Sequence, residues 1–115
     1  MTTPTAITPL QLGQAQPTDA NVLLVYTVPA LTQTAVQTID ICNTGSSARL
    51  IRVFFVPSGG AAGVTNAIMY DMSLAGNSTL TWTGPQYLGP AAFISVQVDG
   101  ANAVTFTISG LELAA

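Results

Sequence analysis

Hydrophobic and polar residues alternate with a period of two along much of the chain, which is the pattern of β-strands with one buried face. The clearest alternation lies near the C-terminus, where Ile94, Val96 and Val98 are separated by a serine and a glutamine. Val104, Phe106 and Ile108 then alternate with threonines in the same way. Runs rich in Val, Ile, Thr, Phe and Tyr predict strands over residues 22–28, 34–43, 49–56, 67–71, 78–82, 92–99 and 103–111.

Turn-forming residues separate these runs and exclude long helices. Ten glycines and seven prolines punctuate the chain, and no helix-period segment exceeds two turns. The sequence therefore predicts an all-β fold, an antiparallel β-sandwich of about seven to eight strands with either a jelly-roll or an immunoglobulin-like topology. Residues 99–102 are predicted to form a hairpin turn with Gly100 at positive φ, and a phase shift after Val36 predicts a bulge near Gln37 or Thr38.

The first twenty residues differ from the remainder in composition. They are rich in Thr, Pro, Gln and Ala, and prolines resist helix formation. We expect an extended N-terminal arm over residues 1–20 and a single sandwich domain over residues 21–115, because 115 residues suit one core. Ile7, Leu10 and Leu12 are the arm residues predicted to contact a capsid or a neighbouring subunit, and a free tail is the alternative.

The run Arg49–Val56 is apolar on both faces, unlike the alternating runs. One face is expected to meet the domain's own core and the other a second subunit, and we assign Ile51, Val53 and Phe55 to the subunit interface. A central strand lying under a loop would give the same pattern. The long irregular stretch over 57–66 is expected to cross between sheets or to project from the domain.

Charged residues are scarce, which favours self-association. They make up 6% of the chain, whereas soluble globular chains carry about 25%. A folded monomer of this mass exposes roughly 5,900 Å², which leaves roughly 840 Å² per charged side chain. One partner's share of a standard interface is about 800 Å², so whole interface-sized areas contain no ion to desolvate. Two arginines and no lysine exclude a basic surface for nucleic acid, and no apolar run is long enough to predict a membrane-spanning helix.

The residue types needed for catalysis or metal binding are missing. Without histidine and with one cysteine, Cys42, the chain cannot assemble the usual zinc sets, and its five carboxylates form no calcium-loop motif. Serine and threonine hydroxyls have no histidine or lysine to activate them. We therefore predict no catalytic residue, no cofactor and no metal site, and a protein that is not an enzyme. Trp82 and Tyr87 are the candidates for a surface that binds a ligand or partner, with a buried edge of the core as the alternative role for Trp82.

Four segments carry a resemblance to a known group: Tyr26-Thr27-Val28-Pro29-Ala30, Ile39-Asp40-Ile41-Cys42-Asn43-Thr44, Val56-Pro57-Ser58-Gly59-Gly60 and Ala67-Ile68-Met69-Tyr70-Asp71. In order and spacing the chain resembles small β-sandwich virion proteins of tailed bacteriophages, over roughly residues 21–112. The resemblance implies a structural role in capsid decoration or cement proteins, head fibres or tail-fibre modules, which are commonly homotrimers.

Taken together, these observations predict a decoration protein made in the host cytoplasm and located on the capsid surface of the virion. It would bind the major capsid protein as a homotrimer and so stabilise the head, with no nucleic-acid or membrane partner. The alternative is a head-fibre or tail-fibre module in which Trp82 and Tyr87 face a host receptor or glycan.

Overall fold

A computed structural model describes residues 6–114 of the chain. Within that range the chain forms eight strands and one turn of 3-10 helix, which confirms the all-β prediction. The elements are β1 (Ala6–Ala15), β2 (Leu23–Thr27), β3 (Thr32–Asn43), β4 (Arg49–Val56), η1 (Val64–Asn66), β5 (Ala67–Leu74), β6 (Ser78–Leu88), β7 (Phe93–Val98) and β8 (Val104–Ala114). No helix of the described range is long and apolar enough to cross a membrane.

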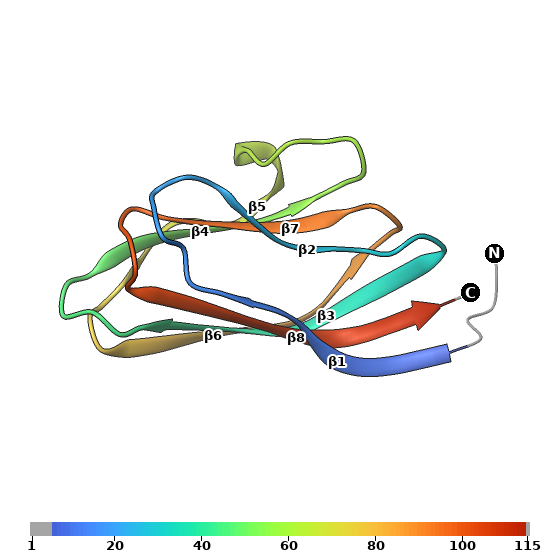
Figure 1. The fold of residues 1–115 in the computed structure, drawn as a ribbon, viewed down its shortest axis with the longest axis horizontal. Helices are drawn as coiled ribbons and strands as arrows, with labels where there is room; N and C mark the ends of the chain where they lie inside the picture. The colour runs from blue at the N-terminus through green and yellow to red at the C-terminus, as the bar shows by residue number, and fades with distance from the viewer. Residues whose placement is uncertain (1–5, 115) are drawn as a thin grey trace.

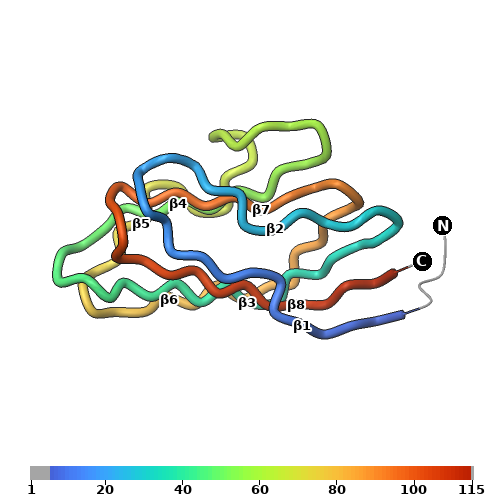
Figure 2. The backbone as a smooth tube through the Cα atoms, viewed as in Figure 1, coloured from blue at the N-terminus to red at the C-terminus, as the bar shows by residue number. Residues whose placement is uncertain are grey.

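Two four-stranded sheets face each other across the core (Figure 1). Sheet A has the order β1-β8-β3-β6 and sheet B the order β2-β7-β4-β5, with every neighbouring pair antiparallel. Only β4 and β5 are consecutive in the chain and also paired, and every other connection between the described strands passes from one sheet to the other (Figure 2). This is the arrangement of a jelly roll, whereas an immunoglobulin-like sandwich pairs more of its consecutive strands.

The same topology corrects the predicted hairpin over residues 99–102. β7 and β8 lie in different sheets, so this segment is a crossover between the sheets. Gly100 is not in the left-handed region, and Asn102 is, with φ of 57°. A Cβ atom at position 100 would meet the guanidinium of Arg49, so a larger residue there would displace that flexible side chain. Alternation reveals strands but not their partners, which is why the pairing was wrong.

The core lies between the sheets and takes one face of each central strand. Residues from β3, β4, β7 and β8 fill it, and the largest fully buried side chains are Phe106, Ile39, Ile41, Ile51, Ile94 and Ile108. The predicted bulge is confirmed, because the register of β3 with both neighbours shifts between Val36 and Thr38. The connection over 57–66 joins β4 to β5 within sheet B and projects over that sheet's outer face (Figure 1), so the expectation of projection holds.

Ile51, Val53 and Phe55, which the sequence assigned to a subunit interface, belong to the domain's own core. Ile51 and Val53 are fully buried, and all three pack in the cluster between the sheets. The opposite face of β4 carries Phe54, whose side chain is only 2% exposed. The alternative of a central strand under a loop is therefore the one that the structure shows, and the interface assignment was wrong because a strand that is apolar on both faces does not reveal which one points inward.

The N-terminal segment also differs from the expected arm over residues 1–20. From Ala6 to Ala15 it forms β1, the edge strand of sheet A, hydrogen-bonded to β8. The segment is a strand of the sandwich rather than an arm apart from it, and pairing with β8 satisfies the backbone groups along one of its edges. Residues 1–5, and residue 115 of the predicted sandwich domain, lie outside the described range.

Candidate functional site

The predicted contact residues of the N-terminal segment separate onto two faces of sheet A. Leu12 is buried in the core, at the extra position where the register with β8 shifts, and Leu10 packs against the core. Ile7 pairs with Leu113 and is 63% exposed. Of the three residues, Ile7 is therefore the one whose side chain is free to meet a partner.

Trp82 and Tyr87, predicted as one possible binding surface, also face opposite ways. Trp82 pairs with the buried Ile39, and its ring meets Phe55 edge-on at 5.6 Å inside the sandwich. Tyr87 pairs with Ala35 and is 69% exposed. The two rings cannot form one aromatic platform, and the role of Trp82 is that of a core edge.

Strand register brings Ile7 and Tyr87 onto the same surface. On β8 the side chains alternate regularly, with Phe106 and Ile108 inward and with Leu111 and Leu113 outward. Across the strands, one row on the outer face of sheet A runs Pro9, Leu111, Ala35, Tyr87, and the next row begins Ile7, Leu113. Side chains directly opposite on one face lie about 4.5–5.5 Å apart at Cβ, so neighbours within each row lie close together.

We call these six residues, Ile7, Pro9, Ala35, Tyr87, Leu111 and Leu113, the terminal patch. The patch lies at the end of sheet A where β1 begins and β8 ends (Figure 1). Pro9 is exposed, the two leucines are half-buried, and Ala35 is buried between its larger neighbours. An apolar surface across four strands is a candidate for contact with another protein.

Beneath the terminal patch, on the inner face of the same strands, lies a small polar cluster. The hydroxyl of Tyr26 donates to Oε2 of Glu112 at 2.5 Å and lies 2.8 Å from Oγ1 of Thr34. Burial and the hydrogen bond to Glu112 raise the pKa of Tyr26 to about 12. The cluster joins β2 of sheet B to β3 and β8 of sheet A, and so it holds the sandwich together at this end.

The rest of the outer face of sheet A is polar and almost uncharged. Its rows across the strands are Gln11, Ser109, Thr38, Thr83, then Gln14, Thr107, Asp40, Thr81, then Thr105, Cys42, Thr79. We call this surface the threonine field. Asp40 is its only charged side chain among the described residues, and Asp40 accepts a hydrogen bond from Thr81 at 2.8 Å. Cys42 is half-buried within it.

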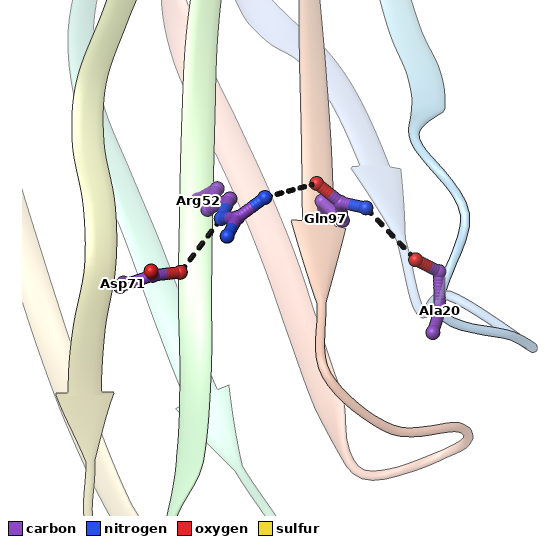
Figure 3. A network of polar contacts seen from close by, with 4 residues as sticks. All are labelled: Ala20, Arg52, Asp71 and Gln97. Atoms are coloured by element: carbon purple, nitrogen blue, oxygen red, sulfur yellow. Dashed lines mark hydrogen bonds and ion pairs between the residues drawn. The ribbon is translucent and has the colours of Figure 1, made fainter. Parts of the chain in front are cut away.

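The outer face of sheet B carries a polar network centred on Arg52 (Figure 3). Nε of Arg52 donates to Asp71 at 2.7 Å, and Nη1 donates to the side-chain oxygen of Gln97 at 3.2 Å. Gln97 in turn donates to the backbone oxygen of Ala20 at 2.9 Å. The ring of Tyr70 lies 4.0 Å from the guanidinium carbon. The network ties β5, β4 and β7 to the segment that leads into β2.

These polar groups do not form a metal-binding cluster in the described part of the chain. Over residues 6–114, no three carboxylate, cysteine or histidine side chains converge where a metal ion would bind. Asp71 accepts a hydrogen bond from Arg52 and raises the pKa of that guanidinium, so Arg52 stays charged and links β4 to β5. The arrangement can bind and orient partners, and the terminal patch is the candidate site for doing so.

Sequence reasoning missed Leu111, Leu113, Pro9 and Ala35 as members of this site. The signal for the two leucines was present, because the alternation of Val104, Phe106 and Ile108 places odd-numbered residues outward, and apolar residues replace threonines there after Ser109. The rows could not be found without the order of the strands, because β1, β8, β3 and β6 are neighbours in sheet A but lie far apart in the sequence.

Comparison with known proteins finds likeness in fold. No family model matches the chain, and no curated protein matches it. Similar solved structures include chains from infectious bursal disease virus: the Gx strain (12% identity, TM-score 0.47), the Gt strain (5%, 0.48) and the T13 viral particle (10%, 0.52). Each alignment covers 93% of this chain and 32%, 30% and 30% of the neighbour, so the chain spans about a third of their length. At these identities, the match to the T13 particle chain establishes a shared fold.

Proposed function

We propose that the chain is a non-enzymatic structural protein of a virus particle, which decorates the capsid surface as a homotrimer bound to the major capsid protein. The terminal patch is the observation that carries this proposal. It supplies apolar contact area on a face that no other part of the described chain covers. Support comes from the fold shared with a chain of the T13 particle of infectious bursal disease virus.

The energetics of the terminal patch favour a protein partner. Burying apolar surface stabilises a contact by roughly 25 cal/mol per Å², and a charge on the same surface opposes burial unless it is paired. Ile7 and Tyr87 project most of their side chains into solvent, and no charged side chain belongs to the patch. The single carboxylate of this region, Glu112, points inward to Tyr26. A partner therefore gains the apolar contact without desolvating an ion.

Association through the terminal patch is tested by placing a charge in it. The purified chain is expected to scatter light as a particle of three times 11.8 kDa, and Ile7→Arg or Tyr87→Arg is expected to give a monomer. Both side chains are mostly exposed, so both variants should fold. Thr81→Arg introduces the same charge into the threonine field of the same sheet and is expected to stay trimeric. A wild-type chain that remains monomeric at millimolar concentration contradicts the trimer.

Attachment to a capsid needs a separate measurement. Gradient-purified particles made from the genome that encodes the chain are expected to contain it in stoichiometric amounts, and a reconstruction should locate a jelly-roll density on the outer shell. Particles assembled with Ile7→Arg are expected to lose that density. Particles that never contain the chain, or that bear it only on the tail, contradict the decoration role.

A further inference from the structure

A pocket of about 330 Å³ lies on the outer face of sheet B, on the opposite side of the sandwich from the terminal patch. Leu50 and Arg52 of β4, Asp71 of β5, Gln97 of β7 and the following Asp99 line it, together with Ala20. We call it the Arg52 pocket. Its volume is at the lower end of the range for small-molecule sites, about 300–1,000 Å³, which suits one small ring.

The polar groups of the Arg52 pocket are held in place without a ligand. Asp71 and Gln97 fix the guanidinium of Arg52 from two sides, and Tyr70 lies against its carbon (Figure 3). Gln97 is itself anchored to the backbone of Ala20. Because these side chains are already ordered, a ligand that meets them loses less conformational entropy on binding than one that must order free side chains.

Several donors and acceptors of the Arg52 pocket remain available for hydrogen bonds after the internal contacts are made. A guanidinium has five N–H donors, and the contacts with Asp71 and Gln97 use two of them. The second oxygen of Asp71 accepts no hydrogen bond from the described residues. The side chain of Asp99 likewise makes no hydrogen bond or ion pair within the described range. Donors and carboxylate acceptors therefore line one hollow together.

This combination selects the chemistry of the ligand. Two carboxylates oppose an anion, and the guanidinium between the strands opposes a cation. A hydroxyl group both donates and accepts, so neighbouring hydroxyls can donate to Asp71 or Asp99 while accepting from Arg52. Leu50 contributes an apolar side chain against which the C–H face of a ring can pack. We propose that the Arg52 pocket binds one ring of a neutral saccharide through adjacent hydroxyls.

The test uses the ¹⁵N-labelled full chain and a panel of neutral monosaccharides titrated to high millimolar concentration. At least one sugar is expected to shift the Arg52 Nε–H and the Gln97 side-chain amide signals in a saturable way. The methyl glycoside of the same sugar is then titrated in the same way. A site for one ring of a larger glycan keeps its affinity when a methyl group blocks the anomeric hydroxyl. A site for the free sugar loses it. Failure of the whole panel to move these signals overturns the proposal.

Two matched variants separate binding from a general effect of charge. Asp99→Asn removes an acceptor from the Arg52 pocket and is expected to weaken binding about tenfold or more, since a hydrogen bond to a charged group contributes roughly 1.5–3 kcal/mol. Asp40→Asn removes the same charge from the threonine field and is expected to leave the affinity unchanged. Equal losses in both variants overturn the proposal. The saccharide site does not depend on the terminal patch, so its failure leaves the light-scattering test of the trimer unaffected, and the reverse also holds.

Discussion

The outer faces of the two sheets differ in how the connecting segments cover them. On sheet B, Phe54 and its cross-strand neighbour Ser95 are each only 2% exposed, and the connection over 57–66 lies over the outer face of this sheet (Figure 1). On sheet A, Ile7 and Tyr87 remain mostly exposed. Phe54 of sheet B is thus buried, although Leu24, Leu50, Tyr70 and Met72 of the same sheet are 40–56% exposed, whereas no described segment covers Ile7 and Tyr87 of sheet A.

The connections explain this difference. The longest connection in the described range joins β4 to β5 and carries η1, which lies against β4. The strands of sheet A are linked to the rest by shorter segments, and these are used in crossing to sheet B. No described segment remains to cover the terminal patch. Burial of an apolar surface that has no cover of its own favours association with a partner.

The strongest test of this comparison truncates one aromatic ring on each face. Phe54→Ala is expected to lower the free energy of unfolding by about 3–5 kcal/mol, since it removes a buried ring and leaves a cavity under the 57–66 connection. Tyr87→Ala is expected to change the stability of the monomer by less than about 0.5 kcal/mol, because its ring is already in solvent. Urea denaturation of both variants, at a concentration where the chain is monomeric, measures the difference.

The two variants control for each other, since both remove an aromatic ring from a strand. A loss for Tyr87→Ala that approaches the loss for Phe54→Ala would mean that the terminal patch is packed within the chain. The comparison between the faces would then fail.

Much of the fold could be predicted because period-two alternation is a local signal. Each strand predicted from residue 22 onward corresponds to a strand in the structure, and the bulge after Val36 lies where the phase of the pattern changes. The frequent glycines and prolines also correctly predicted that no long helix forms in the described range. These inferences depend on neighbours in the sequence, which is why they hold without knowledge of the topology.

What the sequence did not reveal depends on contacts between distant segments. Gly100 lies at a sheet-to-sheet crossover beside the side chain of Arg49, a residue about fifty positions earlier in the sequence. Ile51 and Phe54 are both apolar, and the phase of the facing strands decides which of them enters the core. Likewise, Ile7 and Tyr87 were found separately, since they lie in adjacent rows of the sheet and β8 and β3 separate their strands.

A second prediction addresses the polar cluster beneath the terminal patch. Tyr26→Phe is expected to lower the free energy of unfolding by about 1–2 kcal/mol at neutral pH, because the hydrogen bond to a partly buried carboxylate is lost. The pKa of Tyr26 is raised to about 12 in the folded chain, above its ordinary value of 10.0, so the folded state holds this proton more tightly. The contribution is complete below pH 10 and falls as pH rises towards 12.

Denaturation measured across this pH range checks the sign. The wild type is expected to lose stability from about pH 10 upward, and the Tyr26→Phe variant is expected to lose less over the same interval. No lysine side chain titrates alongside Tyr26, which simplifies the comparison. Identical slopes in the two proteins would show that the Tyr26–Glu112 contact does not stabilise this end of the sandwich.

The smallest expected effect lies in the threonine field, and it sharpens the comparison within sheet A. Thr81→Val removes the hydroxyl that donates to Asp40 but keeps a β-branched side chain on an exposed strand position. Its stability is expected to stay within about 0.5 kcal/mol of the wild type, as for most exposed substitutions. Its mass by light scattering should also be unchanged, since the proposed contact lies at the other end of the sheet. If Thr81→Val instead dissociates the oligomer while Tyr87→Arg does not, the hydroxyl-rich end of sheet A is the contact surface, and the apolar end is exposed for another reason.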